Sequence, residues 1–262
     1  KNPEDVGRKL ESMSKRGLIY RIRRNGETKY RLAPFIIGIL EFQIKNMTPT
    51  LGVNIGMMME GGYSKTIFEK KLPHLRSIPI KAEIAPKDKI MPYDDAEAII
   101  KSRDRISITD CLCRNLGEEM GNPCSHPKDT CFQLNEWADY YVENGIAQYI
   151  TKEDALERLK RNEKLCLVTQ VANSKDPELM CSCCSCHCQV LGNMWKYPGP
   201  AQEKLSNYIC NWDAIACINC GVCAKRCPAG AHKFVEGKQE FYTEKCIGCG
   251  LCVTTCKANA CT

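Results

Sequence analysis

Eight cysteines near the C-terminal end of the sequence repeat one spacing twice. Each repeat has three cysteines separated by two residues, and a fourth that follows after three more. The repeats are Cys217, Cys220, Cys223 and Cys227, then Cys246, Cys249, Cys252 and Cys256. Three cysteines at this spacing wrap a loop around one [4Fe–4S] cubane, while the fourth binds the neighbouring cluster. The pattern therefore predicts two clusters, one held by Cys217, Cys220, Cys223 and Cys256, the other by Cys246, Cys249, Cys252 and Cys227.

This double repeat resembles the bacterial dicluster ferredoxins over residues 209–262. It departs from them at Lys257, which stands where a proline usually follows the fourth cysteine. The resemblance implies a small, internally duplicated βαβ fold and one-electron transfer at low potential. Two zinc sites are the less favoured alternative, because zinc sites rarely use this triple cysteine run.

A second set of nine cysteines lies in the middle of the chain, in two groups. They are Cys111, Cys113, Cys124 and Cys131, then Cys181, Cys183, Cys184, Cys186 and Cys188. No disulfide or packing argument needs nine cysteines in two short loops, so we predict a further metal site. Each group could hold its own [4Fe–4S] cluster, or the two loops could close over one shared site. One or two additional iron–sulfur clusters are favoured over zinc.

Four further residues carry less information. His187 completes a C-x-x-C-H pattern, which is typical of haem attachment but is expected by accident in so dense a cysteine run. We expect a hydrogen-bonding or exposed histidine, with iron or zinc ligation as the alternative. Cys166, Cys210 and Cys261 have no clear partners and are predicted to be small buried apolar residues.

The composition favours metal-bound thiolates over disulfides. The chain has 262 residues and 20 cysteines, and these cluster in short runs where neighbouring thiols are poorly placed to bridge. A reducing compartment follows, which we predict to be the cytoplasm of an anaerobic cell. With 44% hydrophobic residues the chain can form one to three compact domains. No apolar stretch approaches the roughly 20 residues of a membrane span.

The first 50 residues hold the whole excess of positive charge, with eleven Lys and Arg against five Asp and Glu. A helix is predicted over 3–16, followed by a hairpin over 18–32 that turns at Asn25-Gly26. This helix and hairpin resemble the second half of a winged-helix domain, assigned to residues 1–46. The basic hairpin residues are Arg21, Arg23, Arg24, Lys29 and Arg31. They could contact DNA phosphates, but docking to a redox partner or to the chain's own acidic body is favoured.

The remaining elements complete an α+β fold. We expect a helix over 34–45, then a linker region over 47–92 with short extended pieces. An irregular, α-rich, cysteine-containing domain is predicted over 93–208. Within it we expect helices over 94–102 and 133–144, a strand over 106–109, and a helix capped by Thr151. The dicluster ferredoxin domain over 209–262 ends the chain.

In this arrangement the chain resembles uncharacterised dicluster proteins of anaerobic bacteria. Those join a winged-helix-like part, a CxCR segment, a cysteine-packed loop and a ferredoxin. No nucleotide, flavin or hydrolase motif is present in the sequence. We therefore expect an electron-transfer protein or oxidoreductase subunit acting with a redox partner protein, more than a stand-alone enzyme. A redox-sensing DNA-binding regulator and a catalytic or activase subunit are the alternatives, and homo- or hetero-oligomers stay open.

Overall fold

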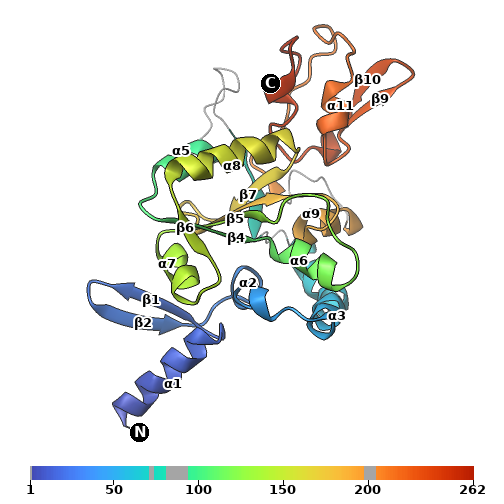
Figure 1. The fold of residues 1–262 in the computed structure, drawn as a ribbon. Coiled ribbons are helices and arrows are strands. Elements are labelled where there is room, and N and C mark those ends of the chain that lie inside the picture. The colour runs from blue at the N-terminus through green and yellow to red at the C-terminus, as the bar shows by residue number, and fades with distance from the viewer. Residues whose placement is uncertain (1, 71–73, 81–93, 198–204) are drawn as a thin grey trace.

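The structure is a computed structural model, and it describes residues 2–70, 74–80, 94–197 and 205–262. Figure 1 shows an elongated molecule in which the N-terminal helix and the C-terminal cysteine-rich module lie at opposite ends of a central sheet. Within the described residues, no helix is both long enough and apolar enough to span a bilayer.

The centre of the fold is a six-stranded antiparallel sheet with strand order β3-β7-β8-β5-β4-β6. Its strands are β3 (Leu75–Ser77), β4 (Ile106–Asp110), β5 (Asp129–Leu134), β6 (Gln148–Ile150), β7 (Val168–Ala172) and β8 (Leu179–Cys183). The α+β class is therefore confirmed, but the expectation of an irregular, α-rich middle region is wrong. The sequence did not predict this sheet, because some of its strand pairs join segments about a hundred positions apart, as in β3 with β7. Local periodicity cannot show such pairings.

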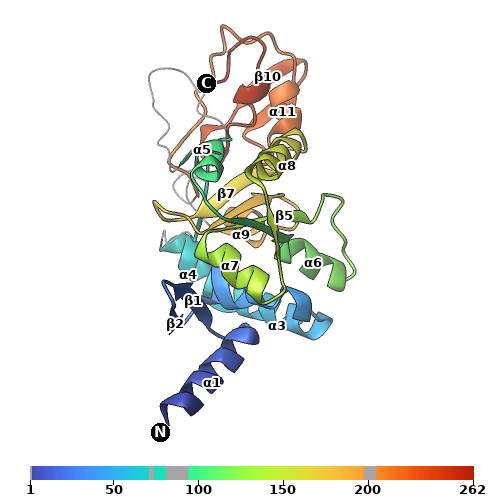
Figure 2. The ribbon, with the colours of Figure 1, turned by 60° about the vertical axis from the view of Figure 1, so that its left-hand side comes forward.

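Helices cover both faces of the sheet (Figures 1 and 2). On one face lie α5 (Ala96–Lys101) and α8 (Lys152–Lys164), which pack Ile99, Ile100, Ala155 and Leu159 into an apolar core. On the other lie α6 (Leu112–Glu119), α7 (Glu136–Glu143) and α9 (Gln189–Asn193). Thr151 caps α8 through a reciprocal box with Asp154, as expected. The helix expected over 133–144 begins only at Glu136, because Gln133 and Leu134 belong to β5.

Residues 34–69 differ most from expectation. The helix expected over 34–45 is broken by Ile37, whose φ is 51°, and by Gly38, so that only α2 (Leu40–Phe42) is α-helical. Within the predicted linker, α3 (Pro49–Met58) and α4 (Ser64–Glu69) are helices joined by a kink at Gly62, where φ is 126°. The prediction of short extended pieces is therefore wrong for residues 49–69. It is correct for β3, which lies later in the same predicted linker. The part of that linker at 81–92 lies outside the described residues, and the domain boundaries stay a prediction.

The N-terminal helix and hairpin form as predicted. Helix α1 (Pro3–Lys15) precedes β1 (Tyr20–Arg24) and β2 (Glu27–Arg31), and the turn residues Asn25 and Gly26 both have positive φ. Tyr20 packs in an aromatic cluster with Phe42, Trp137 and Tyr140, which ties the hairpin to α7. Whether these elements are part of a winged helix stays a prediction.

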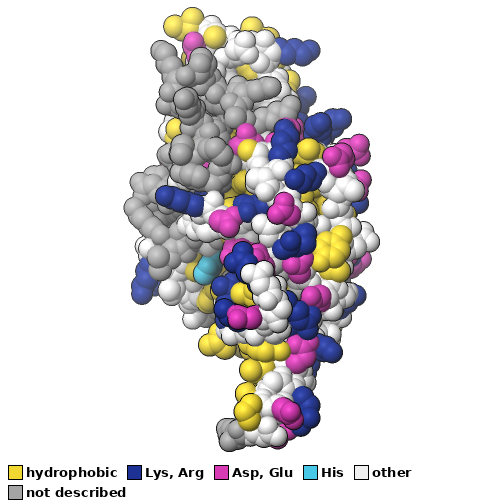
Figure 3. Space-filling model, turned by 90° about the vertical axis from the view of Figure 1, so that its left-hand side faces the viewer, with side chains coloured by type: hydrophobic (Ala, Val, Ile, Leu, Met, Phe, Trp, Pro, Cys, Tyr) yellow, Lys and Arg dark blue, Asp and Glu magenta, His cyan; other side chains and the backbone are white. Residues whose placement is uncertain are grey.

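Three arginines of the hairpin, Arg21, Arg23 and Arg24, bind the chain's own carboxylates. Arg21 is buried and pairs with Glu11 and with Glu143 of α7. Arg23 contacts the same two carboxylates, and Arg24 pairs with Glu136. On the face shown in Figure 3, positive and negative side chains lie interspersed. These ion pairs join the hairpin to α1 and α7, while the role of the basic hairpin toward a partner stays a prediction.

The C-terminal module contains α11 (Val222–Arg226), β9 (His232–Val235) and β10 (Lys238–Phe241). Strands β9 and β10 form an antiparallel hairpin. The two ends of the module are joined by the bridge between Trp212 and Cys261.

Candidate metal centres

The first predicted ferredoxin set comes together. Cys217, Cys220, Cys223 and Cys256 line one small cavity. Cys217 and Cys220 lie in the loop before α11, Cys223 lies in the first turn of that helix, and Cys256 comes from the second repeat. Gly221, with φ of 70°, makes the turn between Cys220 and α11. Cys252 and Cys261 line the same cavity, so it gathers the predicted crossed set together with two further cysteines, and ligation by these thiols stays a prediction.

The second predicted set is gathered in part. The thiols of Cys227, Cys246 and Cys249 are close enough that Cys227 raises the pKa of the other two, after burial as the larger cause. Backbone N–H groups of Ala231 and Gly248 donate to the sulfurs of Cys227 and Cys246, at 3.2 and 3.5 Å. Such hydrogen bonds stabilise thiolate charge and tune cluster potential.

Cys252, the fourth member of that set, points elsewhere. Its sulfur lies 3.6 Å from that of Cys210. Together with His232 and Cys261, these two cysteines place four buried ligand atoms within 4.8 Å of one another. Cys210 and Cys261 are buried, as predicted, but the expectation that they lack partners is wrong. Their grouping comes from the pairing of the module's two ends, which no local spacing reveals.

Six of the nine middle cysteines lie side by side along one cavity, and we call this group the six-thiol ring. In order around the ring they are Cys111, Cys113, Cys188, Cys183, Cys181 and Cys131. Cys131 and Cys181 are cross-strand partners of β5 and β8, with their sulfurs 3.3 Å apart. Alternation along β8 puts Cys181 and Cys183 on one face and Ser182 on the other.

The ring borders an apolar cavity of about 80 Å³. Its other walls come from the broken segment 36–41 and from α3, α4 and α6. Glu41 is an acidic side chain that lines it, and the N–H of Gly38 donates to its carboxylate at 2.7 Å. Burial raises the pKa of Glu41 to about 7, against the lowering effect of that hydrogen bond. Sequence reasoning missed Glu41, because nothing local places it beside cysteines 70 positions away.

A buried arginine supplies positive charge to the middle cysteines. Arg114 is 0% exposed, and it donates to the carbonyls of Pro127 and Ser182 and to the hydroxyl of Thr130. Hydrogen bonds from neighbouring thiols lower the pKa of Cys111 and Arg114 adds to that effect, while burial opposes both. For Cys184, Arg114 is the main cause that lowers the pKa against burial. The CxCR segment quoted above contains this residue, but its role is visible only in three dimensions.

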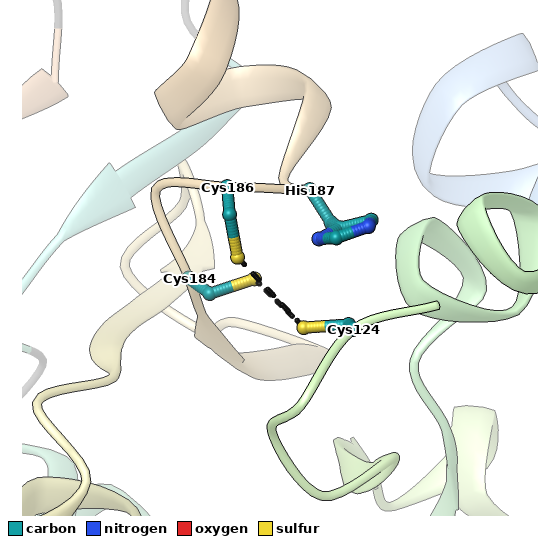
Figure 4. Close-up of side chains that lie close together, drawn as sticks. All are labelled: Cys124, Cys184, Cys186 and His187. Atoms are coloured by element: carbon teal, nitrogen blue, oxygen red, sulfur yellow. Dashed lines mark hydrogen bonds between the residues drawn. The ribbon is translucent and has the colours of Figure 1, made fainter. Parts of the chain in front are cut away.

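The other three middle cysteines lie with His187 in a separate group (Figure 4). The sulfur of Cys124 is 3.9 Å from that of Cys184 and 3.8 Å from that of Cys186. The structure therefore divides the nine cysteines differently from the two groups in the sequence. Cys124, from the first group, lies with Cys184 and Cys186, from the second. Adjacent Cys183 and Cys184 both line the cavity beside the ring, but only Cys184 also belongs to the group with Cys124, Cys186 and His187. Cys166, in contrast with its prediction, is only half-buried at the end of α8.

Comparison with known proteins identifies one part of the chain. Residues 210–257 match the model of a 4Fe-4S dicluster domain. The match and the cysteine groups support an iron–sulfur module of dicluster ferredoxin type at the C-terminus. No curated protein and no solved structure matches the chain.

Proposed function

We propose that this chain is an iron–sulfur electron-transfer protein. It carries low-potential electrons, one at a time, between a redox partner protein and three clusters. Two are [4Fe–4S] clusters held by the eight cysteines of the C-terminal repeats, and the third is a further iron–sulfur cluster in the six-thiol ring. The observation that carries the proposal is the doubled cysteine repeat within the dicluster match.

The six-thiol ring has the composition that an iron–sulfur cluster requires. A cubane needs four thiolates, and the ring offers six around a cavity with few polar groups. A buried site of this kind is costly for charged thiolates unless cations neutralise them. Arg114 supplies one buried positive charge beside the ring, and bound iron would supply the rest.

Packing supports an internal path from the C-terminal module to the ring. Cys227 and Cys249 of the second ferredoxin set pack against the same apolar core that contains Cys183 and Cys188 of the ring. Arg226 holds the two parts together, since it donates to the carbonyls of Leu251 and Glu163 at 3.1 Å. A continuous packed core keeps redox centres at fixed separations and excludes water between them.

The outer end of the module has the features of a docking face for a redox partner. Cys220 is exposed, and the loop around it presents Ile215 at 98% and Ile218 at 66% exposure. Exposed apolar side chains beside a redox centre suit a small, transient interface. Electrons would enter at the first cluster and leave the module through the second.

Two cysteine substitutions and a matched control test the proposal. Cys220→Ser and Cys249→Ser each remove one predicted ligand of a different ferredoxin cluster, and Cys166→Ser removes a half-buried thiol outside all the sites. On protein purified without oxygen, we expect lower iron and sulfide for the first two variants only. We also expect the low-potential EPR signal to lose the contribution of one cluster in each. Unchanged iron and EPR in both variants would overturn the ligand assignment and the electron-transfer role.

A further inference from the structure

A four-residue site lies beside the thiol ring, formed by two loops that are far apart in sequence. Cys124 comes from the loop after α6, while Cys184, Cys186 and His187 come from the turn between β8 and α9 (Figure 4). We propose that these four side chains bind a single zinc ion, and that they take no part in an iron–sulfur cluster. The proposal stands on this site alone and holds whether or not the electron-transfer role is correct.

The spacing of the sulfur atoms fits one tetrahedral metal ion. Zinc–sulfur bonds of about 2.3 Å in tetrahedral geometry place two sulfurs about 3.8 Å apart. The sulfur of Cys124 lies 3.9 and 3.8 Å from those of Cys184 and Cys186. Cysteines around a cubane each bind a different iron, so they must spread around it and cannot converge on one point.

The imidazole of His187 is already in the state that a zinc ligand needs. Its Nε2 lies 2.8 Å from the carbonyl oxygen of Asn122, which assigns the proton to Nε2. Its Nδ1 is buried and has no hydrogen-bond partner in the described structure. A metal-bound histidine typically donates its second N–H to a carbonyl, which fixes the ring and leaves the other nitrogen free to bind. The unpartnered Nδ1 is thus explained by a metal ion among the three sulfurs.

Helix α6 is shaped to admit this imidazole. A Cβ on Gly117 would collide with the His187 ring and would come within 2.8 Å of the Asn122 carbonyl. Gly117 therefore lies where the His187 ring and the Asn122 carbonyl both come close to the backbone of α6, and a larger residue would not fit there. Gly117 acts as a positioning residue for His187.

Four protein ligands leave no open coordination position, which is typical of a structural zinc site. The ion would join the loop at Cys124 to the turn at 184–187. That turn lies directly between Cys183 and Cys188 of the ring. Zinc would therefore hold the ring cysteines in place before any cluster is inserted, and Arg114, beside Cys184, would offset the charge of three thiolates.

The test measures zinc and iron together on the full chain, expressed with both metals and purified without oxygen. We expect about one zinc per chain, and X-ray absorption at the zinc edge should show three sulfur ligands and one nitrogen. Cys124→Ser and Gly117→Ala should each lower zinc occupancy, with the EPR of the ferredoxin clusters retained as a sign of folded protein. Cys166→Ser should keep its zinc.

Two variants at His187 keep the proposal falsifiable if Cys124→Ser fails to fold. His187→Cys should retain zinc with four sulfur ligands, and His187→Ala should release it more readily to a chelator. Cobalt(II) in place of zinc should give thiolate charge-transfer bands that shift in His187→Cys. Absence of zinc from the wild type, or loss of iron without loss of zinc in Cys124→Ser, would overturn the proposal. A third result would also overturn the proposal: zinc whose ligands are not three sulfurs and one nitrogen, and whose occupancy does not change in these variants. Such zinc would be an adventitious ion only.

Discussion

At the scale of single residues, the buried charges decide which cysteines can be thiolates. Arg114 is enclosed between the ring and the zinc-type group, and it satisfies three oxygen acceptors there. Removal of one partner from a buried charged network costs far more than loss of an exposed pair. We therefore expect this residue to link folding of the middle region to the proposed binding of metal there.

Arg114→Met should lower the free energy of unfolding by about 3–5 kcal/mol. The reason is that the carbonyls and the hydroxyl it binds are left unpaired and nearby thiolates lose their buried cation. Iron and zinc bound by the middle region should fall as well. Arg105→Met is the matched control, since Arg105 pairs with Asp139 at the surface and should cost about 1 kcal/mol or less. Denaturant unfolding and metal analysis measure both, and equal costs for the two variants would contradict this role.

Glu41 gives the fold a dependence on pH. Its pKa is raised from the ordinary 4.5 to about 7, so folding favours the protonated form. The stability from this group is fully present below pH 4.5 and is lost as pH rises through 7. Glu41→Gln should remove that loss, so the variant should gain stability relative to wild type between pH 5 and 8. Unfolding curves at both pH values, with the exposed Glu27→Gln as control, test this, and a pH-independent difference would refute it.

At the scale of elements, local signals predict local structure. The Asn25-Gly26 turn and the Thr151 capping box each lie within a few residues, and both form as expected. Helix α3 was missed although Thr48 and Pro49 provide its cap and first residue, because its glycines and methionines hide the helical period. The sequence around Ile37 also predicts a helix. In the structure the helix is broken there, and Ile36 and Ile37 line the cavity beside the ring.

The same division holds for the candidate sites. The crossed ferredoxin set was predictable, since its cysteines follow a spacing set by one loop around a cluster. The division of the nine middle cysteines was not, because Cys131 meets Cys181 only through the register of β5 and β8. His187 could have been assigned to a metal only with knowledge of the Asn122 carbonyl that holds its other nitrogen.

The hairpin should depend on acidic residues of the body for its position. Arg21 is buried between Glu11 and Glu143, and it loses one of these two carboxylates in Glu143→Ala. We expect a cost of about 1–3 kcal/mol, because a charged group in a buried position is left half-paired. Faster proteolysis of the hairpin should accompany it. Glu157→Ala, at an exposed position, is the control. Equal stability of the two variants would show that the ion pairs of Arg21 do not stabilise the hairpin.

At the scale of the whole molecule, the proposed electron path needs the C-terminal module and the central sheet to move as one body. Arg226 is the polar link between them, through Glu163 at the end of α8 and Leu251 in the second cluster loop. The shared apolar core supplies the rest of the contact. The proposed electron transfer over this junction would depend on a fixed distance between its two sides.

Arg226→Met should slow reduction of the ring cluster by electrons that enter through the module, and should leave the iron content unchanged. Lys225→Met, an exposed neighbour in α11, should leave both unchanged. The oxidised protein is mixed rapidly with a one-electron reductant and studied by freeze-quench EPR. The spectra follow reduction of the ring cluster separately from reduction of the ferredoxin clusters. The same rate in both variants would place the path elsewhere.

Iron and acid-labile sulfide per chain, measured on protein purified without oxygen, give the number of clusters that the protein holds. Two ferredoxin cubanes and one cubane-sized cluster in the ring predict about 12 iron and about 12 sulfide. About 8 of each would contradict the ring cluster and would leave a two-cluster carrier. Fewer than that, with the protein folded, would contradict the electron-transfer account itself.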